Sequence, residues 1–163
     1  MPVTRDIFLS YRRPRAVIAR KLAEGTREDR AIATVFGACL VLFIARWPAR
    51  AREAHLEGDS LERLISTDVY ALLFILPLIL YGVAALSHIA ARLFRARGGW
   101  YSARLALFWA LLASAPFLVL NGLVEGMIGP GVELSIAGFL WFMSFFWLWV
   151  PMFLEAEWGG AHE

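Results

Sequence analysis

The chain has few of the groups on which most catalytic and metal sites depend. Cys39 is its only cysteine, so an intramolecular disulfide and a cysteine-based metal cluster are both excluded. Its three histidines, His55, His88 and His162, lie far apart in the sequence, and no nucleophile-elbow, zinc-protease, P-loop or C-x-x-C motif is present. We therefore expect no catalytic residues, no bound metal and no cofactor, and we predict that the protein is not an enzyme.

Charged residues are also missing from the centre of every long apolar run. Apolar residues make up 60% of the 163 residues, and four runs are each about long enough to cross a bilayer: Ala31–Trp47, Val69–Ala91, about 101–122, and Leu134–Leu154. The pattern predicts an all-α polytopic membrane protein with a bundle of four transmembrane helices. Coupled transport usually needs a charged residue inside a span, so it is disfavoured, whereas a passive pore or a lipid-handling role stays open.

Lysine is nearly absent, since Lys21 is the only one among the sixteen basic residues. A GC-rich coding genome would produce this arginine bias, which favours a bacterial source. The net charge is +2, and the arginines cluster in loops beside apolar runs. We interpret them as signals of membrane topology rather than as a nucleic-acid footprint, and we expect no nucleic-acid partner.

The basic turn Arg92–Arg104 contains four arginines and no acid, and it separates the second and third apolar runs. Arginine is retained on the cytoplasmic side of a membrane, so this turn fixes the direction of the other segments. The three segments on its side of the membrane carry 8, 4 and 0 Lys/Arg, or twelve, against four in the two outer loops. The sequence therefore predicts a multi-pass protein of the bacterial cytoplasmic (inner) membrane with both termini cytoplasmic.

Three regions follow from this pattern: a basic cytoplasmic or interfacial leader over 1–30, the transmembrane domain over 31–154, and an acidic cytoplasmic tail over 155–163. The leader is predicted to be amphipathic, with Val17, Ile18 and Leu22 on one helical face. It lies either on anionic lipid or free in solvent as a topology signal. Six arginines beside the membrane are predicted to contact lipid headgroups: Arg12, Arg13, Arg15, Arg92, Arg95 and Arg97.

Helix limits are expected at several capping and proline positions. Thr26 with Asp29 predicts a helix start before the first span, and Pro48 predicts its end. A capping box of Asp59 with Glu62 predicts a helix that starts near Ser60 and continues into the second span.

Irregularities are expected inside and after the later spans. Pro77 and Pro116 predict kinks in the second and third spans. Residues 121–131 are rich in glycine and contain no Lys or Arg, so they predict a tight turn on the outer side. His88 near the end of the second span is interpreted either as a proton or metal site, or as an interfacial residue hydrogen-bonded to a neighbour.

Small residues at four-residue spacing mark a possible helix-packing face on the third span. Ala106, Ala110 and Ser114 would let another helix approach closely. Because a short turn joins the second and third spans, the small pair Ser87 and Ala91 on the second span is the expected partner.

Three segments resemble the Yip family of Ypt/Rab-interacting integral membrane proteins, in its bacterial branch. They are Leu9-Ser-Tyr-Arg-Arg-Pro-Arg-Ala-Val-Ile18, Ala90-Ala-Arg-Leu-Phe94 and Trp100-Tyr-Ser-Ala-Arg-Leu-Ala-Leu-Phe108. The resemblance extends over about residues 5–154. Eukaryotic relatives act in vesicle trafficking and contact small GTPases, and many members have five spans, against the four expected here. The family offers no catalytic residues to transfer.

The leading expectation for function is a non-enzymatic membrane protein of the Yip type that organises membrane or acts as a scaffold. Its partners would be the lipid bilayer and either copies of itself or other membrane protein subunits. Two alternatives remain: an accessory subunit of a larger bacterial membrane complex, respiratory or photosynthetic, with the aromatic fourth span as its docking surface, and a lipid transporter or channel that uses the proline kinks.

Overall fold

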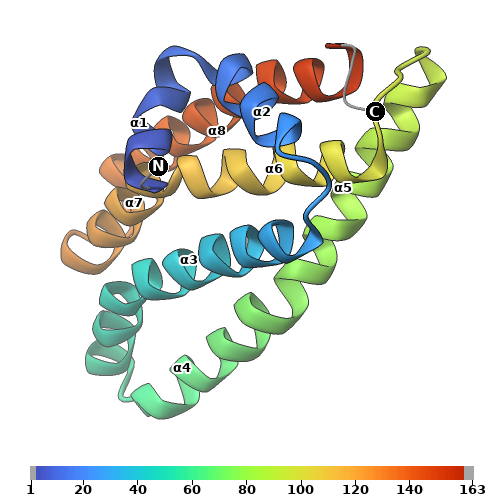
Figure 1. The fold of residues 1–163 in the computed structure, drawn as a ribbon. Coiled ribbons are helices and arrows are strands. Elements are labelled where there is room, and N and C mark those ends of the chain that lie inside the picture. Colours follow the sequence, from blue (N-terminus) through green and yellow to red (C-terminus); the bar gives the residue numbers. More distant parts are fainter. Residues whose placement is uncertain (1–2, 160–163) are drawn as a thin grey trace.

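The computed structural model describes residues 3–159, and these residues form helices joined by short connections, without a strand (Figure 1). In chain order the segments are α1 (Val3–Arg12), α2 (Pro14–Ala23), α3 (Glu28–Glu57), α4 (Leu61–Val69), the π-helical segment η1 (Tyr70–Ile75), α5 (Leu76–Leu93), α6 (Trp100–Ala113), α7 (Ala115–Met127) and α8 (Val132–Trp158).

The long apolar helices indicate a multi-pass membrane protein. Three helical stretches are long and apolar enough to cross a bilayer: Glu28–Glu57, Leu61–Leu93 and Val132–Trp158. Helices α6 and α7 together make a fourth candidate, bent by 47° at their junction. The all-α class and the presence of three or four membrane-length helices thus agree with the prediction.

Helix α6 forms the centre of the molecule and is buried on nearly every side. Leu105, Ala106 and Trp109 pack in a cluster with residues of α2 and α8. Leu107 and Phe108 pack against α3 and α5, while Leu111 contacts Ala38 of α3 and Leu118 of α7. A helix that is apolar all round is expected at such a central position.

Helix α7 crosses α3 at very short distance because glycines lie at the contact. A Cβ atom added at Gly122 would lie 1.9 Å from the carbonyl oxygen of Ala45, and one at Gly126 would lie 2.3 Å from the Cβ of Pro48. Gly122 and Gly126 form a G-x-x-x-G motif, which lets the backbones of membrane helices approach. The prediction of a turn over 121–131 is wrong in its first half, since α7 continues to Met127.

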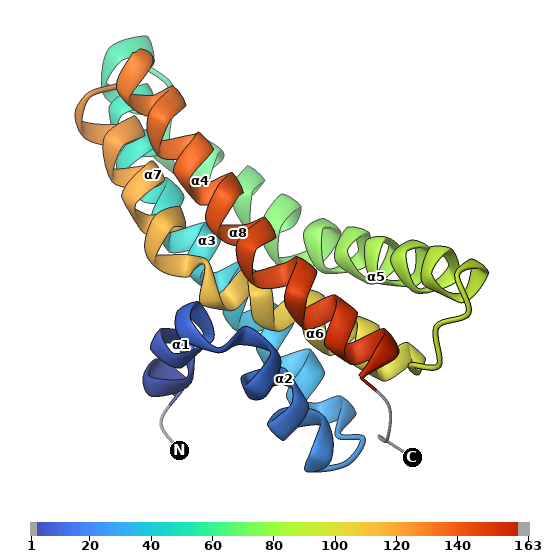
Figure 2. The same ribbon diagram turned by 90° about the horizontal axis from the view of Figure 1, so that it is seen from above.

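The α4–η1–α5 stretch is one continuous helical segment that lies apart from the others over much of its length (Figure 2). Only 11% of its most apolar 18-residue window is buried, and Leu78 and Leu86 are 73% and 69% exposed. Such a surface fits contact with lipid. The Pro77 irregularity appears as the wide turn η1 just before it, where the amide of Leu76 donates to Ala71, five residues back.

Several predicted helix limits change in the structure. Pro48 does not end the first span, because α3 continues to Glu57. The predicted Thr26 cap is wrong, since the N-cap is Arg27 and it makes no side-chain capping bond. The start near Ser60 is confirmed, but the predicted capping box is wrong, because the N-cap is Ser60 rather than Asp59 and its hydroxyl accepts from the amide of Arg63. The predicted kink at Pro116 appears as the break after Ala113.

The C-terminal region begins as a continuation of α8 rather than as a separate tail. Glu155 and Glu157 belong to the last turns of this helix, which ends at Trp158. The remainder of the predicted acidic tail, residues 160–163 with His162, lies outside the described residues.

Candidate functional site

The connection between α5 and α6 is bound tightly to the end of α8. The backbone amides of Arg97 and Gly98 both donate to the carbonyl oxygen of Glu157, at 2.9 and 3.0 Å. These bonds satisfy a carbonyl that has no partner within its own helix end. A Cβ atom at Gly98 would lie 2.5 Å from the carbonyl oxygen of Ala156, so only glycine permits this approach. The turn therefore brings α5, α6 and α8 together at one place.

A buried histidine–glutamate pair lies directly beneath this turn. His88 of α5 contacts Glu157 of α8 through Nδ1 and Oε1, which are 2.8 Å apart. Their side chains are 4% and 0% exposed. The His88 ring also packs against Trp100 of α6, with ring centroids 4.6 Å apart. The pair thus joins α5 to α8, which is far along the chain, and the ring contact with Trp100 adds α6.

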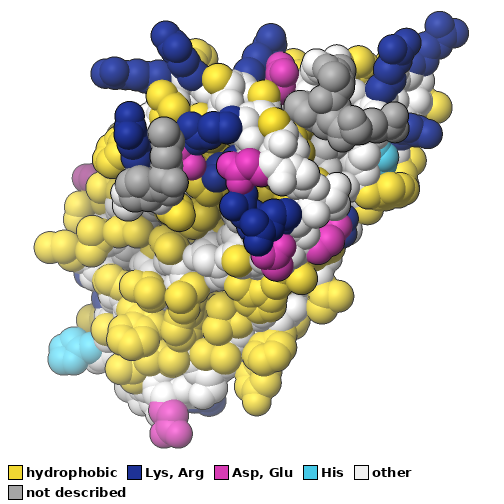
Figure 3. All heavy atoms as spheres, viewed as in Figure 1, with side chains coloured by type: hydrophobic (Ala, Val, Ile, Leu, Met, Phe, Trp, Pro, Cys, Tyr) yellow, Lys and Arg dark blue, Asp and Glu magenta, His cyan; other side chains and the backbone are white. Residues whose placement is uncertain are grey.

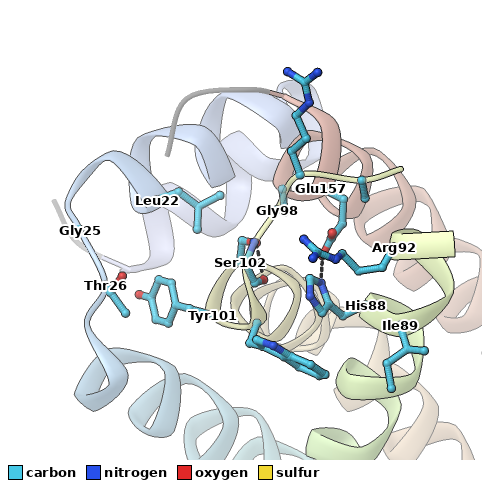
Figure 4. A pocket seen from close by; sticks show the side chains of 15 residues that line it. Leu22, Gly25, Thr26, His88, Ile89, Arg92, Gly98, Tyr101, Ser102 and Glu157 are labelled. Atoms are coloured by element: carbon cyan, nitrogen blue, oxygen red, sulfur yellow. Dashed lines mark hydrogen bonds and ion pairs between the residues drawn. The ribbon is translucent and has the colours of Figure 1, made fainter. Parts of the chain in front are cut away.

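The pair forms one side of an open pocket of about 1130 Å³ (Figure 4). His88, Arg92 and Ile89 line it from α5, Trp100, Tyr101 and Ser102 from the start of α6, and Glu157 from α8. Nε2 of His88 makes no hydrogen bond to any residue that the structure describes. The ring is therefore held by Glu157 on one side, and its second nitrogen has no hydrogen-bond partner among the described residues.

Of the two interpretations of His88, a hydrogen bond to a neighbour is the one seen. The neighbour is a buried carboxylate, which distinguishes His88 from an ordinary residue of the membrane interface. Within residues 3–159, no group of three His, Cys, Asp or Glu side chains lies close enough to hold a metal ion.

The six arginines predicted to contact lipid headgroups are all exposed. None of them makes an ion pair within the described part of the chain. Basic side chains gather over α1, α2 and the α5–α6 connection at the same end of the molecule (Figure 3). Arg92 and Arg97 line the pocket, whereas Arg95 does not. Of the six predicted arginines, Arg92 and Arg97 thus belong to the site, and the other four do not line it.

The leader is folded against the helices rather than separate from them. Val17, Ile18 and Leu22 of α2 are buried between α6 and α8. In α1, the Tyr11 hydroxyl donates to the carbonyl oxygen of Ala113, and burial raises the pKa of Tyr11 to about 12. The exposed arginines of the leader are therefore carried on a helix pair whose position is fixed.

A polar cluster around Asp6 stabilises this position. Asp6 is bound by Arg20 at 2.5 Å and by Lys21 at 3.3 Å. Burial alone would raise the pKa of Asp6, but the hydrogen bond from Arg20 and the charge of Lys21 outweigh it and lower the pKa below its usual value. Lys21 also lies over the ring of Trp109, at 3.7 Å from its centroid.

A second polar cluster lies near the start of the Leu61–Leu93 helical stretch, at the opposite end from His88. Asp68 of α4 accepts two hydrogen bonds from Arg50 of α3, at 2.7 and 2.8 Å, and a longer one from Arg46 at 3.4 Å. Its side chain is 7% exposed. A carboxylate that accepts from both Nε and Nη2 of one guanidinium makes a strong, directional contact. The cluster joins α3 to α4 where the two helices meet.

The predicted small-residue face of α6 is fully buried, with Ala106, Ala110 and Ser114 at 0% exposure. Its predicted partner is wrong. Ala106 and Ala110 pack with residues of α2 and α8, and α5 instead contacts α6 through Ala84. The indole of Trp141 in α8 donates to the Ser114 hydroxyl at 3.3 Å.

Three features of the site were not predicted from the sequence: Glu157, Asp6 and the Gly122–Gly126 contact. The glycine contact had a visible signal in its G-x-x-x-G spacing. Glu157 had only its position within one turn of an apolar span. Comparison of the chain with protein-family models, with curated proteins and with solved structures found no match.

Proposed function

We propose that this chain is a non-enzymatic integral membrane protein of the Yip type, which organises membrane or acts as a scaffold for a partner. The observation that supports the proposal is the separation of its surfaces. One end carries exposed arginines without ion pairs within residues 3–159, while helices such as α5 expose large apolar side chains. An anionic membrane surface and the lipid interior would match these two surfaces.

The proposed location is the bacterial cytoplasmic membrane, with the basic end on the cytoplasmic side. The N-terminal helix pair, the start of α3, the α5–α6 connection and the end of α8 all lie toward this end (Figures 1 and 2). The excess of twelve basic residues over four supports this direction. The α1–α2 pair would then lie at the membrane interface, with Phe8 of α1, which is 74% exposed, directed away from the core.

The scaffold contact is proposed to use the basic end and the exposed apolar sides. The small residues of α6 and the glycines of α7 are already used within the molecule, so they offer no free face to another subunit. Copies of the same chain or other membrane subunits would pack along α5.

Reporter fusions test the proposed direction in the membrane. Fusions placed after Arg97 and at Glu163 should both report the cytoplasm. A periplasmic reporter at either position would contradict the proposed topology.

Purification in a mild detergent tests the scaffold role, and a homo-oligomer is the expected product.

A second candidate, an accessory subunit of a larger bacterial membrane complex, is favoured by the aromatic surface of α8. Phe139, Phe142 and Trp147 are 61%, 47% and 68% exposed. Aromatic side chains of this size are common at the centre of protein interfaces. Recovery of a large complex with fixed stoichiometry, in place of a homo-oligomer, would select this candidate.

A further inference from the structure

We propose that the pocket between α5, α6 and α8 is a binding site for a phosphate group, either in a phospholipid headgroup or in a soluble phosphate ester. The proposal goes beyond the scaffold role and does not depend on it. It requires only the pocket geometry at the basic end of the molecule.

His88 is the buried group directed at the ligand. It is 3% exposed, and its Nδ1 is engaged by Glu157, so the ring cannot turn without loss of that bond. A carboxylate at one ring nitrogen fixes the orientation and the role of the other. Nε2 lacks a partner in the described structure. When the ring carries both protons, Nε2 donates to an anion in the pocket.

The charge around the pocket favours an anion. Glu157 is the one acid among the described residues that line the pocket, and it is already bound to His88. Arg92 and Arg97 line the pocket without an ion pair in residues 3–159, so an anion would meet two guanidinium groups there. Arg92 is also one helical turn beyond His88 on α5, and residues four apart lie on the same helix face. Figure 4 shows both side chains at the pocket.

The start of α6 adds donors to the same pocket. Trp100 and Tyr101 are its first two residues, both line the pocket, and their backbone amides have no hydrogen-bond partner in the described part of the chain. Free amides and the helix dipole make such a helix start suitable for phosphate. A Cβ added at Gly99 would meet no atom within 4 Å, so the space beside these amides is open.

A cation is a poorer fit for this pocket. Oε2 of Glu157 has no hydrogen-bond partner, but it is fully buried, and a Cβ at Gly98 would lie 2.9 Å from it. An ammonium group in the pocket would be repelled by Arg92 and Arg97, and the buried Oε2 would not be exposed to it.

The apolar side of the pocket decides how a lipid would lie. Ile89 lines the pocket and is 55% exposed, and the exposed Leu86 and Leu93 of α5 lie near it in the sequence. An acyl chain can follow this surface of α5 while its phosphate reaches His88. A soluble phosphate ester would use the polar part of the pocket alone.

The test is calorimetric titration of the full-length protein in non-ionic detergent with three probes: inorganic phosphate, glycerol 1-phosphate, and phosphatidylglycerol in mixed micelles. We expect saturable binding of one phosphate group per protein. Binding of phosphatidylglycerol at least ten-fold tighter than glycerol 1-phosphate would identify a lipid site, and similar affinities would identify a soluble ester.

Variants distinguish this pocket from general attraction to a basic surface. Arg92→Gln and Arg97→Gln should each weaken binding about ten-fold. Arg95→Asn is the matched control, because Arg95 is exposed in the same connection, has φ 61°, which asparagine tolerates, and does not line the pocket. It should change affinity less than two-fold.

His88→Gln should weaken binding to a similar degree, and the thermal unfolding of each variant will show whether it is folded. The arginine variants test the pocket even if His88→Gln is unstable, because both arginines are exposed. The absence of saturable binding to all three probes, or an equal loss with Arg95→Asn, would overturn the proposal.

Discussion

Helix α7 lies against α3 with Gly122 and Gly126 at the contact, whereas α4, η1 and α5 form a long stretch with few residues buried along it. Lipid tails are as apolar as leucine, so membrane helices associate through close backbone packing or polar contacts rather than through the hydrophobic effect. The molecule uses close packing for α7. For the long stretch it uses buried polar groups near both ends.

These two polar contacts are well separated. Asp68 binds Arg50 of α3, and His88 binds Glu157 of α8. Twenty residues of helix rise about 30 Å, which is close to the thickness of the bilayer core. In the proposed membrane orientation, the polar pairs would lie where water or headgroups begin. The apolar middle of the stretch would then face lipid and make a limited contact with α3 and α6. Close packing and polar contacts should respond differently to substitution.

The largest effect is expected at the glycine contact. Gly122→Leu must separate α7 from the backbone of Ala45, so it should lower the free energy of unfolding by roughly 3 kcal/mol or more. Gly82→Leu on α5 is the matched control, because a Cβ at Gly82 meets no atom within 4 Å. Unfolding in mixed SDS micelles measures both variants. Equal destabilisation by the two would show that α7 does not approach α3 as described.

The next effect is expected at the Asp68 cluster. Asp68→Ala leaves Arg50 with Glu53 as its remaining partner and should destabilise the protein by about 2 kcal/mol. Asp59→Ala is the control, since Asp59 pairs with Arg63, which is 71% exposed, and should change stability by less than about 0.5 kcal/mol. A similar small change for both would place Asp68 in water rather than in a buried contact.

A somewhat smaller effect is expected in α6. Ala110→Phe should overpack the contact with α2 and α8 and cost about 1–2 kcal/mol. Leu111→Phe should also destabilise, because Leu111 is only 7% exposed and packs on Ala38 and Leu118. Thermal unfolding in detergent measures both. If Leu111→Phe were neutral, one side of α6 would face lipid, and α6 would not be the central helix.

The sequence predicted membrane helices well and their neighbours poorly. Apolar length marks a span, and Ser60 and Pro116 mark a start and a break, because these signals act within one helix. Signals within one helix could not predict which helix packs against Ala106 and Ala110. A small residue permits close approach by any helix, and the short connection between α5 and α6 suggested the wrong one.

Pro48 shows a related difficulty. Proline removes a backbone donor, which usually ends a helix in water. In α3 the helix continues past it and α7 packs against Pro48, since Gly126 leaves the space for the ring. Whether the helix can continue past Pro48 at this contact thus depends on Gly126, which lies far along the chain. The same holds for Glu157, whose role depends on a histidine 69 positions earlier.

A double-mutant cycle between His88 and Glu157 in unfolding experiments tests most directly whether this buried pair joins α5 to α8. The single variants His88→Ala and Glu157→Ala are compared with the double variant. The control is the pair of His88 with Glu155. Glu155 lies on α8, like Glu157, but it has no contact with His88 among the described residues. We predict a coupling energy of about 1 kcal/mol for His88 with Glu157, within the range measured for polar contacts between membrane helices, and none for the control pair. Additive effects of His88→Ala and Glu157→Ala would contradict the claim that this buried pair joins α5 to α8.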